Sequence, residues 1–148
     1  MSPERFPTVL ADPTVITFPL GLCGFPEIQR YELSAWGGDG SPYRLMRALE
    51  QGGPEFVVVD PALFFEDYEV ELDDPDADLI GIARSEDALV FVIVTLGDPI
   101  EDSTANLLGP VVVNTVDGRS VQAVQVSPTL TSRARLFAHR GPLATVGG

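Results

Sequence analysis

The sequence predicts an all-β, mainly antiparallel fold: one compact, β-barrel-like domain with at most one or two short helices. Two features predict this class. Short runs rich in β-branched and aromatic residues recur along the chain, and clusters of Gly, Pro and Asp separate them. Many short strands at regular spacing are typical of β-sandwiches and β-barrels, which leave few sheet edges open. The 13 Pro and 14 Gly are spread along the chain, so we expect a single domain over residues 1–148 without a linker.

Seven runs are expected to form strands because their residue types suit a pleated, half-buried surface. In chain order they are residues 15–18, 30–33, 56–59, 68–72, 89–96, 111–115 and 121–126. The last two runs give the clearest hairpin, because Asp117-Gly118 supplies residue types that tolerate the positive φ of a two-residue loop.

The segment from Tyr43 to Gln51 fits two patterns. Tyr43, Leu45 and Leu49 alternate with other residues as on a strand. Leu45, Met46 and Leu49 also fit one face of a helix. We favour the strand.

A short helix is expected over residues 75–80. Asp74 offers an N-cap, and Pro75 suits the first helical position. Acidic residues in the first turn would complement the positive end of the helix dipole. Gly81 would end the helix after about two turns.

Length and cysteine content restrict the class of protein. A chain of this size buries about 70% of its unfolded surface and can fold without crosslinks. We expect residues 1–7 and 141–148 to be loosely ordered tails that the fold does not need. The single cysteine, Cys23, cannot form an internal disulfide, and no apolar signal stretch follows Met1. Both observations favour the reducing cytoplasm. The longest apolar run, residues 88–96, is half the length needed to cross a bilayer, so no membrane insertion is expected.

Charge restricts the class of partner. The chain has 22 acidic residues against 9 basic ones, all Arg, for a net charge of −13. Twelve of the acidic residues lie between Glu55 and Asp87 beside one base, Arg84, so this stretch carries −11 of the total. Direct binding to nucleic acid is not expected, because that affinity comes mainly from Lys and Arg at phosphates. The acidic stretch would attract a basic protein; the alternative is a solvated surface that maintains solubility. Self-repulsion favours a monomer.

Residues that commonly perform catalysis are scarce. The single histidine, His139, lies near the C-terminus, where we expect it on the surface. Cys23 has no neighbouring cation in the sequence to activate its thiol, and we expect it to be a small buried or half-buried side chain. We therefore expect no enzymatic activity and no cofactor. A small hydrolase with paired carboxylates, such as Asp73 and Asp74, stays open as an alternative that would require a cleft.

One acidic motif imitates a metal site. Asp74-x-Asp76-x-Asp78 matches the start of a calcium-binding loop. However, Leu79 replaces the glycine of the sixth position, and Ser85 replaces the glutamate of the twelfth. We expect no metal here.

Three aromatic residues, Phe64, Phe65 and Tyr68, lie within five positions and are flanked by acids. Aromatic anchors surrounded by charge are typical of the centres of protein interfaces. The alternative is that Phe64 and Phe65 lie on opposite faces of a bend, with one plugging the core and the other half covered.

Two polar sets complete the candidate partner-binding residues. They are the acids Asp73, Asp74, Asp76 and Asp78, and the uncharged residues Ser103, Thr104 and Asn106. The acids would attract a basic partner, and the uncharged side chains would offer it hydrogen bonds. The alternative for the uncharged set is that it caps a local turn.

Four blocks of sequence, in this order, resemble the flagellar assembly factor FliW family. They are residues 16–25 (ITFPLGLCGF), 55–61 (EFVVVDP), 67–72 (DYEVEL) and 103–114 (STANLLGPVVVN). The resemblance covers about Val15 to Arg135. The chain departs from the family pattern at Cys23, where a proline is common, which restores a backbone N–H to the first turn. Residues 127–133 also lack the aromatic residue that the family tends to carry there.

The resemblance implies a single-domain, β-barrel-like protein of the bacterial cytoplasm without enzymatic activity. It further implies two protein partners, newly made flagellin and the translational regulator CsrA. Binding would prevent CsrA from repressing flagellin synthesis, and accumulated flagellin would release CsrA by competition. A chaperone role for another exported subunit is an alternative that the sequence leaves open.

Overall fold

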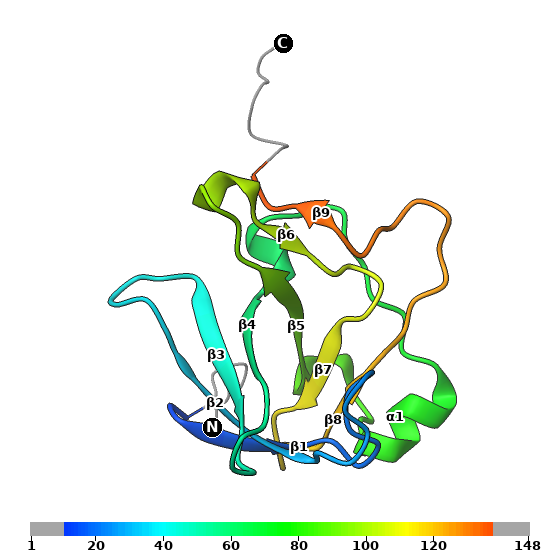
Figure 1. The fold of residues 1–148 in the computed structure, drawn as a ribbon. Coiled ribbons are helices and arrows are strands. Elements are labelled where there is room, and N and C mark those ends of the chain that lie inside the picture. The colour runs from blue at the N-terminus through cyan, green and yellow to red at the C-terminus, as the bar shows by residue number, and fades with distance from the viewer. Residues whose placement is uncertain (1–10, 138–148) are drawn as a thin grey trace.

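The computed structural model describes residues 11–137. The two expected tails, residues 1–7 and 141–148, and His139 lie outside the described residues. In the described part, the expectation of a mainly antiparallel β-fold is confirmed (Figure 1). The strands are β1 (Thr14–Thr17), β2 (Arg30–Ala35), β3 (Tyr43–Ala48), β4 (Glu55–Val59), β5 (Ala88–Thr95), β6 (Thr104–Ala105), β7 (Val111–Asn114), β8 (Ser120–Gln122) and β9 (Ala134–Arg135). One α-helix, α1 (Asp74–Ile80), and three short 3-10 turns, η2 (Pro61–Leu63), η3 (Ser85–Asp87) and η4 (Ile100–Asp102), join them within residues 11–137.

The sheet curls towards a barrel without closing. Strands β1 to β5 pair in sequence order, each antiparallel to the next. Strand β5 then pairs with two partners: its first half with β7, and its second half with β6. Strand β8 pairs with β7, and a single bridge between Thr17 and Arg119 links β1 to the chain just before β8. Figure 1 shows α1 beside β8, and β6 and β9 at the opposite end of the molecule.

Alternation along the strands divides the interior into three cores. Phe91 on β5 points into the curled sheet with Val111 and Val113 of β7. Their neighbour Val92 faces the other way, into a second core under η2. A third core, built on Val112 of β7, lies between the sheet and α1. Strand β5 therefore supports packing on both faces, which accounts for its long run of apolar residues.

Residues 68–72 do not form the expected strand. They cross the outer face of the sheet, and no described strand pairs with them. The backbone N–H of Glu71 donates to Gln125 Oε1 (2.9 Å), and the carbonyl of Glu71 accepts from Gln125 Nε2 (2.9 Å). A side-chain amide thus takes the place of a neighbouring strand. We call residues 67–73 the strap.

The hairpin between β7 and β8 is confirmed, but its loop is longer than two residues. The backbone N–H of Asn114 donates to Arg119 O (2.8 Å), so four residues lie between them. Asn114 Oδ1 accepts from the N–H of Val116 (2.8 Å), and Gly118 takes a φ of +83°. The asparagine side chain organises the turn, a contribution that the Asp-Gly pattern does not reveal.

The helix begins one residue earlier than expected. Asp73, not Asp74, is the N-cap, because its side chain accepts from the N–H of Asp76 (2.9 Å). Gly81 ends the helix in the left-handed conformation, as expected. The strand favoured from Tyr43 is confirmed over the helix alternative.

Cys23 is exposed, and the expectation of a buried or half-buried side chain is wrong. Its backbone N–H donates to Gln122 Oε1 (2.8 Å). A proline at this position would have no backbone N–H. In this chain the N–H of Cys23 has a hydrogen-bond partner on β8, which holds the turn against that strand. The two-residue strands β6 and β9 were not expected, because runs so short carry no periodicity.

Candidate protein-binding surface

The strap presents two different faces. Tyr68, Val70 and Leu72 are half-buried and face the sheet. The four acidic residues that alternate with them are exposed: Asp67, Glu69, Glu71 and Asp73. Alternation in an extended segment places every second side chain on the same side. The sequence pattern of a strand is therefore retained, although no strand among residues 11–137 pairs with this segment.

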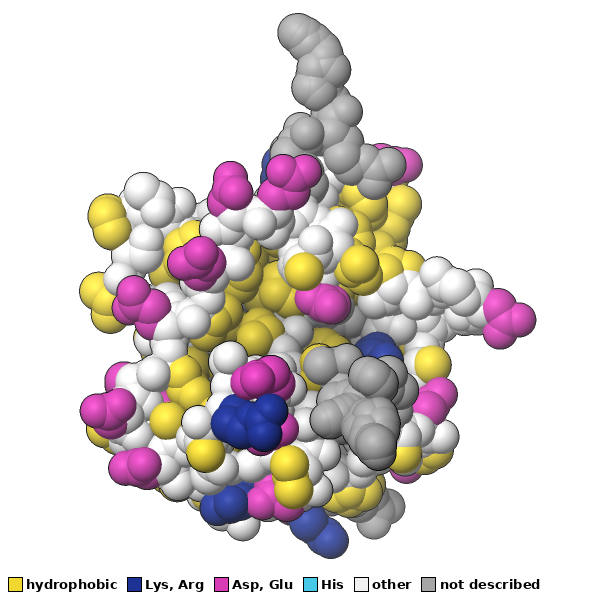
Figure 2. Space-filling view, turned by 180° about the vertical axis from the view of Figure 1, so that it is seen from behind, with side chains coloured by type: hydrophobic (Ala, Val, Ile, Leu, Met, Phe, Trp, Pro, Cys, Tyr) yellow, Lys and Arg dark blue, Asp and Glu magenta, His cyan; other side chains and the backbone are white. Residues whose placement is uncertain are grey.

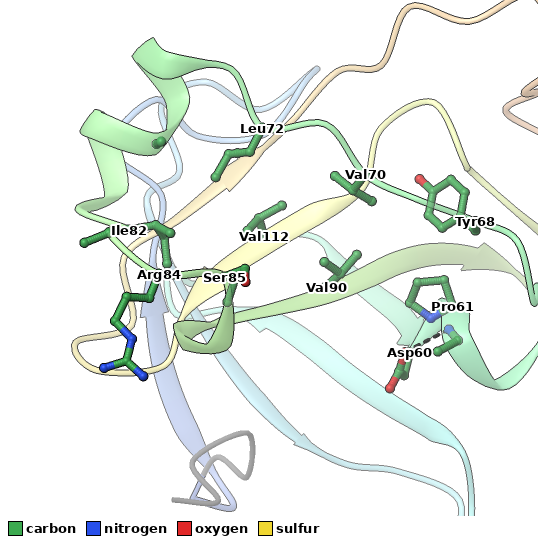
Figure 3. A pocket seen from close by; sticks show the side chains of 14 residues that line it. Asp60, Pro61, Tyr68, Val70, Leu72, Ile82, Arg84, Ser85, Val90 and Val112 are labelled. Carbon is green, nitrogen blue, oxygen red and sulfur yellow. Dashed lines mark hydrogen bonds between the residues drawn. The ribbon is translucent and has the colours of Figure 1, made fainter.

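An apolar groove lies on the sheet side of the strap (Figure 3). Its volume is about 480 Å³. Val90 and Val112 lie beneath Val70 and Leu72, and the chain around Arg84 forms the far wall. Figure 2, seen from behind, shows hydrophobic side chains gathered in a hollow, with acidic side chains spread around it.

The groove contains one carboxylate. Asp60 is the only acidic residue among the described residues that line it. Its side chain accepts from the N–H of Ala62 (2.9 Å) at the start of η2. The hydrolase alternative requires two carboxyl groups facing one cleft. This groove does not provide them. Across residues 11–137, no cluster of His, Cys, Asp and Glu side chains is arranged to hold a metal ion.

Tyr68 anchors the end of the strap. Its hydroxyl donates to the carbonyl of Leu107 (2.7 Å), and burial raises its pKa to about 12. The ring therefore joins the strap to the segment after β6. Tyr68 is one of the candidate partner-binding residues. Its hydrogen bond to Leu107 O gives it a structural role within the fold that does not depend on a partner.

The two phenylalanines differ in burial, as the core-plug alternative expects, but both pack in the same core under η2 rather than on opposite faces. Phe64 is 8% exposed and packs edge-on against Phe137, with ring centroids 5.8 Å apart. Phe65 is half-buried and lines a second hollow with Leu107 and Leu130. Phe64 lines the same hollow, but Phe65 is the more exposed of the two.

The acids of α1 differ in their surroundings. Asp74 and Asp78 are exposed, whereas Asp76 is half-buried. Burial, and then the nearby Asp73 carboxylate, raise the pKa of Asp76 above its ordinary value. Asp73 itself caps the helix. The four acids therefore form one negative corner of the molecule, in which Asp73, Asp74 and Asp78 are exposed and Asp76 is half-buried.

The uncharged polar set has mainly local partners. Ser103 is fully buried, and its hydroxyl accepts from the N–H of Gly97 (2.9 Å). Asn106 Oδ1 accepts from the N–H groups of Leu108 (3.0 Å) and Gly109 (3.1 Å). Thr104 is half-buried in β6. The capping alternative is confirmed for Ser103 and Asn106, and Ser103 has no surface to offer a partner.

The acidic stretch is almost free of ion pairs. The ion pairs between the described side chains are Arg47–Glu32, Arg84–Glu86, Arg119–Asp117 and Arg135–Asp102. Of the twelve acidic residues from Glu55 to Asp87, Glu86 alone belongs to one of these pairs. The negative field of the strap and α1 is therefore uncompensated within residues 11–137.

The residues on the other side of the strap were not among the predicted contact residues. Val124 and Val126 are exposed beside it, and Gln125 between them points inward to hold Glu71. The expected strand over residues 121–126 ends early, at Gln122. A run that is apolar at most positions does not show which of its side chains face solvent.

Comparison with known proteins places the chain in a family. The family model described as FliW protein matches residues 4–136. A flagellar assembly factor FliW from Natranaerobius thermophilus is 37% identical over 132 residues, which are 88% of this chain and 86% of that protein. One from Bacillus subtilis is 34% identical over 119 residues, covering 80% of this chain and 82% of that protein.

The fold agrees with a solved structure of the same kind. A crystal structure of the flagellar assembly factor FliW superposes with a TM-score of 0.76 at 28% identity, covering 83% of this chain and 85% of that chain. In residues 11–137 no helix has the length and apolar character needed to span a bilayer.

Proposed function

Since this chain belongs to the FliW family, whose named members are flagellar assembly factors, we propose that it binds two proteins, flagellin and the regulator CsrA, in the cytoplasm. It acts without chemistry of its own. Binding CsrA relieves the repression of flagellin synthesis, and binding flagellin releases CsrA.

The observation that carries the CsrA part of the proposal is the uncompensated acidic surface. The strap and α1 present carboxylates that lack Arg partners within residues 11–137. Such a surface repels RNA and attracts the basic surface of an RNA-binding protein. A protein of this charge would therefore influence translation through a basic protein partner.

Competition between the partners requires only mass action. If flagellin and CsrA each weaken the binding of the other, linkage makes the effect reciprocal. Flagellin that accumulates in the cell would occupy the protein and free CsrA, and its secretion would reverse the exchange. The protein would thus couple flagellin synthesis to secretion.

Calorimetric titration with the flagellin and the CsrA of the same organism tests the proposal. We expect both to bind, and the affinity for CsrA to fall between low and moderate salt because the charges are exposed. Binding of neither protein contradicts the proposal. Binding of a different exported subunit would instead support the chaperone alternative.

A further inference from the structure

A trough lies on the side of the strap away from the apolar groove. Two adjoining hollows of about 500 and 320 Å³ form it, and they share Glu71, Gln125 and Val126. One wall is the strap, and the other is the segment from residue 124 to residue 130. None of the arginines within residues 11–137 lines either hollow.

The second wall, residues 124–130, carries two solvent-exposed valines. Val124 is 62% exposed, and Val126 is fully exposed. Ala123 and Gln125 donate backbone hydrogen bonds to Pro110 O and Leu108 O (2.8 Å each), so one edge of this segment is paired. Among the described residues, Val124 and Val126 make no hydrogen bond. Single exposed apolar residues are ordinary, but two that alternate along one wall form a contact strip.

The floor of the trough is rigid. Gln125 is 9% exposed, and its amide nitrogen donates to Glu71 O (2.9 Å) and Ala123 O (2.7 Å), while its oxygen accepts from the N–H of Glu71. These bonds fix the distance between the two walls. A surface that is already formed loses less entropy on binding than one that must order.

The strap wall supplies the charge. Asp67, Glu69 and Glu71 line the trough, with Asp73 at its end. None of these carboxylates takes part in an ion pair of the described residues. An occupant must therefore offer aliphatic side chains to one wall and cations to the other.

We propose that this trough docks a segment of the basic partner, the RNA-binding regulator, with aliphatic side chains over Val124 and Val126 and Lys or Arg facing the strap. The inference rests on the proposed function and adds the place of contact. A second copy of this chain does not fit this role, because its charge of −13 would repel the same acidic wall.

Replacing both valines tests the proposal in the full-length protein. Val124→Ser with Val126→Ser removes exposed side chains, and stability should be unchanged. We expect the affinity for purified CsrA to fall at least about tenfold, because burial of even one valine is worth about that factor. Val116→Ser is the matched control, since Val116 is 76% exposed in the β7–β8 loop and lines neither hollow. Its affinity should stay within about twofold of wild type.

A charge-matched pair tests the acidic wall. Glu69→Gln with Glu71→Gln should slow association with CsrA and reduce its salt dependence. Glu27→Gln with Glu101→Gln makes the same change of net charge at exposed positions outside the trough, and should have the smaller effect. Equal effects of the two pairs would show a general field and overturn the assignment of this wall.

The outcomes separate the site from the function. If wild type binds neither CsrA nor flagellin, the proposed function fails and the trough proposal fails with it. If wild type binds CsrA but the valine pair binds equally well, only the trough proposal is overturned. A loss of affinity confined to flagellin also overturns it, because the trough would then belong to the other partner.

Discussion

The hydroxyl of Tyr68 joins the strap to the rest of the molecule through one 2.7 Å hydrogen bond to Leu107 O. Tyr68→Phe keeps the ring and leaves that carbonyl without this donor. We expect the free energy of unfolding to fall by about 1 kcal/mol, the usual value of one such bond. Urea unfolding at pH 7 measures it. An unchanged midpoint would mean that the strap is held by packing and by Gln125 alone.

The same hydroxyl predicts a dependence on pH. Burial raises the pKa of Tyr68 to about 12, against 10.0 for a free tyrosine. The folded state therefore holds this proton more tightly than the unfolded state. The stability linked to it is complete below pH 10 and is lost as the pH rises towards 12. In Tyr68→Phe, the fall in stability between these two values should be smaller than in wild type, measured by chemical unfolding across the range. An identical fall in stability in both proteins would show that Tyr68 does not cause this pH dependence.

Element boundaries depend on which side chain reaches a given backbone group. The strap has the alternation of a strand, yet its partner is the amide of Gln125, which lies 54 positions later. The first residue of α1 depends on which of two adjacent aspartates reaches the N–H of Asp76. Local pattern predicts the type of element in both cases. It does not identify the atom that completes the hydrogen bonding. For the strap that atom comes from a distant part of the chain, and for α1 it belongs to one of two neighbouring aspartates of the same residue type.

Asn114 ties the end of α1 to the β7–β8 hairpin. It is 3% exposed; its amide nitrogen donates to Ile80 O (2.8 Å), and its oxygen accepts from the N–H of Val116 (2.8 Å). Asn114→Ala leaves the buried Ile80 carbonyl and the Val116 N–H without these partners. We expect a loss of about 2 kcal/mol in unfolding free energy.

Thermal and urea unfolding of Asn114→Ala would measure this loss. Gln29→Ala is the control, because Gln29 is exposed and water can replace its bond to Pro19 O. The control should lose less than about 0.5 kcal/mol. Equal losses in the two variants would show that the helix does not depend on Asn114.

The whole molecule combines a curled sheet with a negative surface. The sequence predicts the fold more completely than it predicts the arrangement of the surface charges. Strand runs, turn residues and the four family blocks predicted the β-fold and the family. Composition predicted the charge of the surface but not its arrangement. The alternating order of carboxylates on the strap follows from the sequence once the strap is known to be extended. The exposure of Val124 and Val126 beside the strap does not follow from the sequence, because Val121 and Ala123 of the same run point inward.

A displacement measurement tests whether flagellin and CsrA exchange on this protein. CsrA is bound to the immobilised protein at moderate salt, and flagellin from the same organism is then added in increasing amounts. We expect CsrA to be released as flagellin binds, and excess CsrA to reverse the exchange. A stable complex containing all three proteins, with no loss of CsrA, would contradict it.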